Sequence, residues 1–222
     1  METLTDIREI RRVPAPGPEP LGLAFAGATL WIASREAHEL YAVDPATWTV
    51  GEEVPAPGAP FGIATGKDGI RVVIGFGEDD DDRYIYRFVP GRGFGSNRIE
   101  CPDLSGAHVA FDGDTLYLSQ AHNRRILALD AQGAILREIR LDRVPVGITI
   151  LDGSFYLVTG DKDFRDLQLT KVEAHGETPR VTPLASIPFT ARGLTFDGSR
   201  FWTSDRKNNE IVAFVVPAAE AK

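Results

Sequence analysis

The stretch RGLTFDGSRFWTSDRKNNEIVAFVV, residues 192–216, contains three segments of alternating apolar and polar residues separated by two polar turns. Alternation with a period of two residues is typical of half-buried antiparallel strands. The Asp-Gly pair at 197–198 suits a tight hairpin turn. The stretch therefore predicts a three-stranded sheet close to the end of the chain, and a fourth strand from elsewhere is needed to cover its edge.

The first half of this stretch has four relatives earlier in the chain. They read PLGLAFAGATLWIAS (20–34), PFGIATGKDGIRVVIG (60–75), GAHVAFDGDTLYLSQ (106–120) and PVGITILDGSFYLVTG (145–160). Each opens on a short apolar strand that starts at a glycine, or at His108 in the third copy, and a second strand follows a polar turn. The five anchors are Gly22, Gly62, His108, Gly147 and Gly193, at intervals of 40, 46, 39 and 46 residues. Periods of this length with four strands each are typical of propeller blades.

The N-terminus supplies the missing strand. Residues 8–11 repeat residues 137–140 (REIR) letter for letter, and residues 137–140 belong to the outer strand of the third repeat. We therefore predict an all-β, five-bladed β-propeller in a single domain spanning residues 1–222, with blades at about 21–57, 61–103, 107–141, 146–188 and 192–217. The N-terminal strand, residues 7–14, completes the last blade and closes the ring. An open array with bare edges is the alternative.

Composition narrows the function classes. The formal net charge of −8 argues against non-specific binding to nucleic acid or to an anionic membrane. A single cysteine, Cys101, excludes an intrachain disulfide and a zinc site built from cysteines. No stretch resembles a secretory signal or a membrane span, so a soluble, cytoplasmic protein is predicted. The absence of a phosphate-binding loop, a nucleophile elbow or a metal-binding helix motif leaves the cofactor unknown.

The repeats GLTFDGSRFWTSDRKNNEIVAF and VAFDGDTLYLSQAHNRRILALD resemble those of the NHL, YVTN and SMP-30/gluconolactonase group of propellers. FTARGLTFDG (189–198) is also similar to the Phe-Thr-Gln-Gly-Leu opening of the five-bladed glutaminyl cyclases, but Ala191 and Arg192 stand where one Gln would, and no acidic residue follows Leu194. The SMP-30 resemblance implies a divalent cation held by Glu, Asp and Asn side chains near the axis. The residues before the anchors here are mostly apolar, so that cation cage is not visible. The resemblance specifies the fold and leaves the function open.

The axis of the ring is the expected ligand site, because propeller loops form a concave funnel there. His108 breaks the repeat and is a candidate acid or base, or a donor that orients a ligand, poised near neutral pH, or else a space-filling residue. Arg192 is a candidate clamp for an anion, or else the partner of an acid on the rim. Leu21, Phe61 and Val146 either form the floor of a pocket or plug the channel.

The loops between second and third strands form the predicted rim of the funnel. Arg35, His122 and Asp205 are its candidate ligand-binding residues. Asp161 and Asp163 are weak candidates for a cation site, and no metal site is predicted. The acid run 78–82 reads as a solvated loop rather than a calcium site. Aromatic residues at repeat-equivalent positions predict packing between blades.

Three functions are compatible with this pattern. The first is a scaffold that binds a small molecule or a protein at the funnel face. The second is a lyase, isomerase or hydrolase for a small anion, with Arg192 as the clamp and His108 as the acid or base. Metal-dependent lactone hydrolysis is the third, and it rests on the family resemblance alone.

Overall fold

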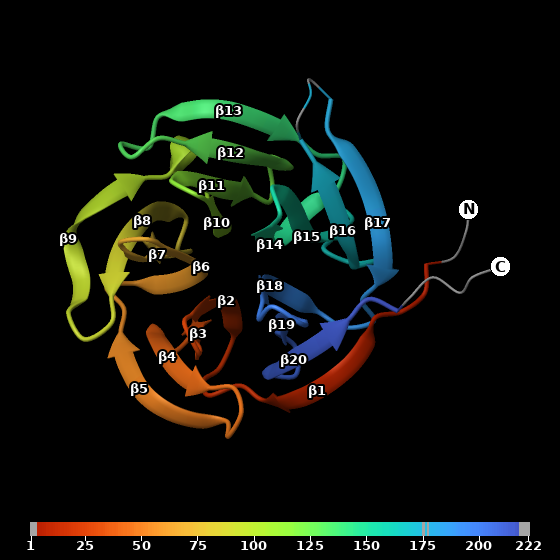
Figure 1. Ribbon diagram of the computed structural model, residues 1–222. Helices are drawn as coiled ribbons and strands as arrows, with labels where there is room; N and C mark the ends of the chain where they lie inside the picture. Colours follow the sequence, from red (N-terminus) through yellow and green to blue (C-terminus); the bar gives the residue numbers. More distant parts are fainter. Residues whose placement is uncertain (1–3, 175, 177, 218–222) are drawn as a thin grey trace.

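The computed structural model describes residues 4–174, 176 and 178–217 and places them in five four-stranded antiparallel sheets around a central axis (Figure 1). Blades 1 to 4 follow the chain, whereas blade 5 combines three C-terminal strands with the N-terminal strand β1. Blade 1 consists of β2 (Pro20–Ala26), β3 (Thr29–Ser34), β4 (Glu39–Asp44) and β5 (Thr49–Pro55), and blade 2 of β6 (Ala59–Gly66), β7 (Gly69–Phe76), β8 (Asp82–Val89) and β9 (Gly93–Glu100). Blade 3 consists of β10 (His108–Asp112), β11 (Thr115–Gln120), β12 (Arg125–Leu129) and β13 (Ile135–Arg140), and blade 4 of β14 (Val144–Leu151), β15 (Ser154–Gly160), β16 (Gln168–Glu173) and β17 (Arg180–Ser186). Blade 5 consists of β18 (Ala191–Phe196), β19 (Phe201–Asp205), β20 (Glu210–Val215) and β1 (Arg8–Pro14). The predicted all-β, five-bladed propeller is confirmed.

Helical structure is scarce in the part of the chain that the structure describes. One short 3-10 turn, η1 (Pro102–Leu104), lies between β9 and β10. None of the described residues forms a helix long and apolar enough to cross a membrane.

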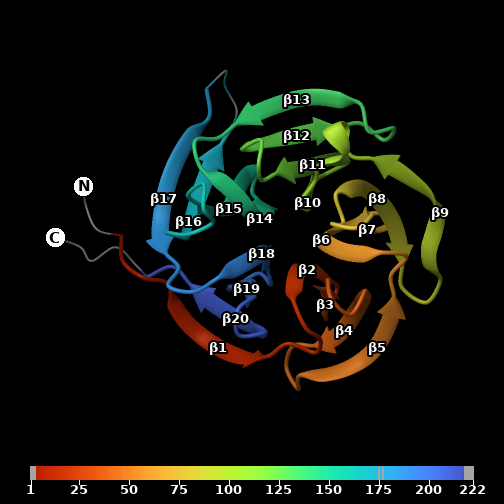
Figure 2. The ribbon, with the colours of Figure 1, turned by 180° about the vertical axis from the view of Figure 1, so that it is seen from behind.

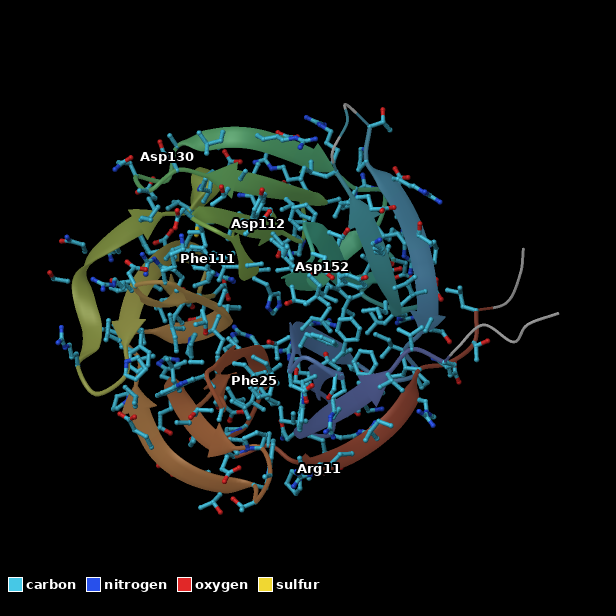
Figure 3. All side chains as sticks on the ribbon, viewed as in Figure 1. Arg11, Phe25, Phe111, Asp112, Asp130 and Asp152 are labelled. Atoms are coloured by element: carbon cyan, nitrogen blue, oxygen red, sulfur yellow. The ribbon has the colours of Figure 1, made fainter. Side chains whose placement is uncertain are left out.

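The Asp-Gly pairs turn the chain in two ways. In blade 4, Asp152 and Gly153 are the central residues of the hairpin, with φ of 49° and 70°, which is the left-handed backbone that a type I′ turn requires. In blade 3, Asp112 still pairs with Thr115, so the turn shifts by one residue to Gly113 and Asp114. Figure 3 labels Asp112 and Asp152 in their hairpins. The pairs thus mark the hairpins, but they do not fix the turn position.

Apolar and aromatic side chains fill the spaces between neighbouring blades, as Figure 3 shows. Tyr117 of blade 3 meets Phe155 of blade 4 edge to face, with ring centroids 4.9 Å apart. Trp31 and Phe88 make the same kind of contact at 4.9 Å between blades 1 and 2. Such pairs add attraction beyond the burial of their surface. The structure confirms the prediction that these aromatic residues pack between blades.

Strand β1 closes the ring by pairing with β20 (Figure 2). The guanidinium of Arg12 in β1 donates to Asp205 at 2.9 Å and to Glu210 at 2.5 Å. The Asp205 side chain is 1% exposed, so this ion pair connects the N-terminal strand to the interior of blade 5. Pairing removes the free edge that β20 would otherwise present to solvent.

The REIR match that identified β1 does not reflect equivalent positions. Ile139 of β13 is buried and pairs with Ile126. In blade 5 the corresponding place opposite Ile211 is taken by Val13, whereas Ile10 is 46% exposed beside a register shift. The register is therefore displaced by three residues from the letter-for-letter match. Burial of alternate side chains sets the register of a strand, and a short identity does not.

The innermost strands touch through the anchor glycines. A Cβ atom on Gly62 would lie 2.2 Å from the Cα atom of His108, and one on Gly193 would lie 2.1 Å from the carbonyl oxygen of Leu21. Gly193 also has φ of 64°, which a glycine adopts without strain. Because the blades meet this closely, the side chain of His108 is an exception among the anchors and occupies space at the axis.

Candidate functional site

A cavity of about 610 Å³ lies on the axis, lined by residues from all five blades. One residue at the entry of each inner strand contributes: Leu21, Phe61, His108, Val146 and Arg192. Of the eight residues predicted for the site, these five together with Arg35 and His122 line the cavity. A volume of several hundred cubic ångströms is typical of small-ligand pockets. The structure thus brings most of the predicted site residues together around a pocket.

His108 lines this cavity and is buried, with 6% of its surface exposed. Its backbone N–H donates to the hydroxyl of Ser119 at 3.1 Å. Burial, with the nearby positive charges of Arg192 and Arg83, lowers the pKa of His108 to about 3. The imidazole is therefore neutral at pH 7, which does not agree with the predicted acid or base poised near neutral pH.

Two arginines face the cavity without a carboxylate partner among the described residues. Arg192 donates to the carbonyl oxygen of Ala191 at 2.8 Å, and Arg83 donates to the carbonyl oxygens of Gly106, at 2.9 Å, and of Asp80. Burial lowers the pKa of both, that of Arg192 to about 10 with help from Arg206. Each remains charged at neutral pH and keeps N–H donors for a ligand.

Each of these two guanidinium groups lies over an aromatic ring. The Cζ atom of Arg83 is 3.5 Å from the ring centroid of Phe61, and that of Arg192 is 5.2 Å from the ring centroid of Phe164. Contact between a guanidinium and an aromatic face is attractive and limits the orientation of the guanidinium plane. The rings therefore hold both donors in place before any ligand binds.

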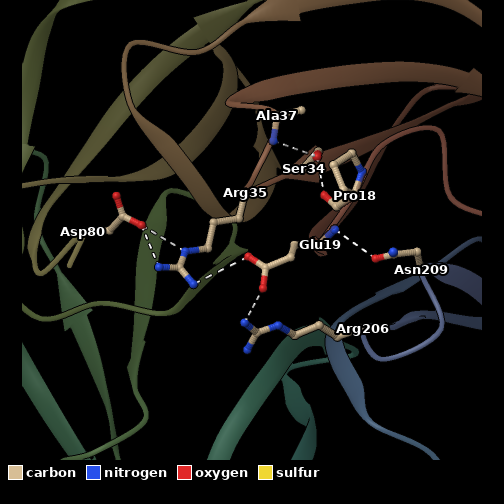
Figure 4. Close-up of polar contacts among 8 residues, drawn as sticks. All are labelled: Pro18, Glu19, Ser34, Arg35, Ala37, Asp80, Arg206 and Asn209. Carbon is tan, nitrogen blue, oxygen red and sulfur yellow. Dashed lines mark hydrogen bonds and ion pairs between the residues drawn. The ribbon is translucent and has the colours of Figure 1, made fainter. Parts of the chain in front are cut away.

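A second pair of arginines at the cavity is already neutralised. Arg35 donates to Asp80 at 2.7 Å and lies 3.6 Å from Glu19, while Arg206 donates to the other oxygen of Glu19 at 2.6 Å (Figure 4). These ion pairs join loops of blades 1, 2 and 5. The two arginines and the two acids, Asp80 and Glu19, carry equal and opposite charge, so this group adds no net charge to the rim.

Acidic residues and a braced loop form the remaining side of the opening. Asp81, Asp82 and Asp103 line the cavity mouth and are exposed to solvent. The segment that contains η1 is held by the buried side chain of Gln120, which donates to the carbonyl oxygens of Pro102, at 2.6 Å, and Ser105, at 2.7 Å. This bracing fixes the wall of the cavity beside His108.

The eighth predicted site residue, Asp205, and the two weak metal candidates, Asp161 and Asp163, lie away from the cavity. Asp205 is fully buried and pairs with Arg12, so it stabilises the ring closure. Asp161 caps its own loop by accepting from the backbone N–H groups of Asp163 and Arg165. Within the described residues, no group of three or more His, Cys, Asp or Glu side chains is placed to hold a metal ion.

The comparisons with known proteins concern the fold. No family model matches the sequence, and no curated protein matches it either. Among solved structures, a glutaminyl cyclase from Myxococcus xanthus aligns with a TM-score of 0.72 and 11% identity over 99% of this chain and 100% of its own. A calcium-binding regucalcin from Agrobacterium tumefaciens aligns with a TM-score of 0.62 and 12% identity over 97% and 96%.

A virginiamycin B lyase from Staphylococcus aureus aligns with a TM-score of 0.56 and 17% identity over 92% of this chain and 83% of its own. The chain has the propeller fold of this group. The resemblance predicted from the repeats is confirmed for the architecture. At these identities the likeness extends to the fold alone, so the function of this propeller has to be argued from its own site.

Sequence reasoning did not single out three residues of the propeller's cavity, Arg83, Phe164 and Arg206. All three fell within the predicted rim loops, where every blade carries polar residues. One signal was present. Arg83 directly precedes the alternating segment 84–89. Because side chains alternate between the two faces of a strand, extending that alternation back by one residue would have assigned the Arg83 side chain to one face of the sheet.

Proposed function

We propose that the propeller binds a small organic anion in its axial cavity. Two half-buried guanidinium groups, those of Arg83 and Arg192, line the cavity without a carboxylate partner among the described residues, and this observation carries the proposal. A desolvated guanidinium is costly unless it is paired, and carboxylates match its fork of donors. The apolar Leu21 and Val146 favour a ligand with an apolar body.

An enzyme is the second candidate, because His108 and Arg192 line one cavity. A lyase, isomerase or hydrolase would use Arg192 to hold the anion and His108 to move a proton. General base catalysis works best when the pKa lies near the working pH, whereas that of His108 is about 3. We therefore favour binding, with the neutral imidazole as a hydrogen-bonding group. Turnover that disappears in His108→Gln while ligand binding persists would favour the enzyme.

The structural neighbours do not decide between these candidates. By their names two of them are enzymes, a cyclase and a lyase, and the third binds calcium. The guanidinium groups of Arg83 and Arg192 do not suit a calcium ion. Exclusion of nucleic acid and membrane partners, and a cytoplasmic location, remain predictions from composition.

The test is thermal unfolding and titration calorimetry of the full chain with a panel of carboxylates that carry apolar bodies. At a ligand concentration of 100 Kd the melting temperature should rise by about 5–10 °C. The double substitution of Arg83 and Arg192 by Met should abolish this rise, whereas Arg92→Met, at an exposed position, should not. If the double Met variant does not melt cooperatively without ligand, the double Lys variant replaces it, with an expected loss of about tenfold. A wild-type protein that responds to no carboxylate contradicts the proposal.

A further inference from the structure

We propose that the ligand is a dicarboxylate with an apolar spacer, one carboxylate held by Arg83 and the other by Arg192. This inference rests on the anion binding proposed above and narrows it to a ligand class. It follows from the position of the two guanidinium groups, from the charge available at each, and from the surface between them.

The two guanidinium groups form separate subsites. Arg83 belongs to β8 of blade 2 and Arg192 to β18 of blade 5, and blade 1 lies between these blades in the ring (Figure 1). Each is held by a backbone carbonyl and by its own aromatic ring, Phe61 or Phe164. A bidentate pair uses both oxygens of a carboxylate, so two guanidinium forks on different blades suit two carboxylates better than one.

The charge at each subsite matches a single carboxylate. Arg83 lies near Asp81, which raises its pKa, and near Arg35, which lowers it, and Arg192 lies near Arg206, which lowers its pKa. Asp80 and Glu19 already neutralise Arg35 and Arg206. Each subsite therefore keeps one guanidinium group that forms no ion pair with a carboxylate of the described residues. A ligand with two separated single charges complements this pattern better than one dianionic group.

Apolar groups line the cavity that the two guanidinium groups share. Leu21 and Val146 lie at the axis and are 5% and 2% exposed, and Ala107 and Ala121 also line the cavity. His108 adds a neutral imidazole rather than a third cation. The exposed Asp81 and Asp82 at the mouth repel further negative charge. An apolar spacer between two carboxylates fits this lining, and a third carboxylate does not.

The experiment is titration calorimetry of the full chain with matched probes. Succinate, glutarate, adipate and pimelate vary the spacer length, pentanoate carries a methyl group in place of one carboxylate of glutarate, and 5-aminopentanoate carries a positively charged aminomethyl group there. We expect one dicarboxylate to bind at least about tenfold more tightly than pentanoate and 5-aminopentanoate, as an added charge-assisted hydrogen-bonded pair would provide. Arg192→Met, which removes one local hydrogen bond, should reduce that dicarboxylate to the affinity of pentanoate. Arg92→Met should leave both affinities unchanged.

The outcomes separate this inference from the proposed function. If pentanoate binds as tightly as every dicarboxylate, the cavity is an anion site but the two-subsite inference is wrong. Tight binding of 5-aminopentanoate would likewise overturn it, because the mouth acids would then hold the ammonium group. If no probe binds, both proposals fail. The spacer series uses the unmodified protein, so it decides the question even if a variant does not fold.

Discussion

At the scale of the residue, the site depends on a break in a repeat. Four anchors are glycine because neighbouring blades leave no room for a Cβ atom, and the fifth is His108. The sequence could therefore predict that His108 lies at the axis. It could not predict its pKa of about 3, because that value depends first on how completely the closed ring buries the imidazole and then on Arg192 and Arg83, which approach it from strands far away in the chain.

The pH dependence of stability should reveal His108. Its pKa is about 3 in the folded protein and about 6.5 in an unfolded chain. Between these values the unfolded state binds more protons, so the native state loses stability as the pH falls below about 6.5, and the contribution is constant above it. From pH 7 to pH 5 His108 should cost about 2 kcal/mol, which urea unfolding at both pH values would measure.

Two variants complete that measurement. In His108→Gln this part of the pH dependence should disappear, whatever the substitution does to stability at pH 7. His122→Gln, at an exposed position, should retain the wild-type dependence. An unchanged dependence in His108→Gln would show that the imidazole is protonated in the folded protein over the same range.

Glu19 limits the positive charge of the cavity, because its carboxylate pairs with both Arg35 and Arg206 (Figure 4). Glu19→Gln should therefore raise the affinity for carboxylates severalfold, with a stability loss of about 1 kcal/mol or less because the ion pairs are partly exposed. Titration calorimetry with glutarate measures the first effect. Glu36→Gln, exposed and in the following loop, is the matched control. Equal affinity in the two variants would show that Glu19 does not affect the cavity.

At the scale of the element, the strands could be predicted from the sequence. Whether the last residue of a second strand faces the funnel or the interior of the blade could not. Ser34, Gln120 and Asp205 each end the second strand of a blade, and all three are buried. Ser34 and Gln120 bond the segment that enters their own blade, whereas Asp205 bonds Arg12 of β1. The sequence placed Asp205 at the funnel because it follows an apolar strand in a polar loop. Its burial depends on a partner about 190 residues away in the chain.

Strand β1 should depend on this ion pair for its stability. Arg12→Met leaves the Asp205 carboxylate, which is 1% exposed, with a hydrogen bond from Asn208. Removing one partner of a buried ion pair costs several kcal/mol; since the Arg12 side chain is 28% exposed, we expect about 2–3 kcal/mol here. Chemical denaturation measures the loss. Arg8→Met on the same strand should change stability by about 0.5 kcal/mol or less, and an equal effect of both substitutions would contradict the assigned role of Arg12.

At the scale of the whole molecule, the repeat predicted the ring because each blade needs a neighbour on both sides. The REIR identity identified the correct closing strand, although the four matching residues do not occupy equivalent positions in β1 and β13. The assignment was still correct because it depended on the place of the N-terminal strand in the order of the repeats. The cavity was less predictable. Its charge depends on ion pairs among blades 1, 2 and 5, and the pair between Glu19 and Arg206 joins the two ends of the blade order, so it exists only once the ring has closed.

Closure makes a prediction about cooperativity. Deleting residues 1–13 removes most of β1 together with Arg12, exposes the edge of β20 and leaves Asp205 buried without its cation. The truncated chain should then lose the single cooperative unfolding transition of the intact protein, followed by circular dichroism on heating. A truncated protein that melts like the intact one would exclude the closed ring, and the axial cavity with it.

Relocating β1 to the C-terminal end of the chain tests whether its pairing with β20, rather than its place at the N-terminus, closes the ring. Arg8 pairs with Val215, so the start of β1 lies beside the end of β20. Residues 7–14 placed after Val216 through an Asn-Gly turn can therefore form the same antiparallel pair as a hairpin. This relocated strand should restore the cooperative transition to the truncated chain, and it should also restore carboxylate binding, because the ion pairs at the rim return with the ring. A shuffled version of the eight residues should restore neither. If both versions rescue equally, the added length rather than the pairing of β1 stabilises the ring.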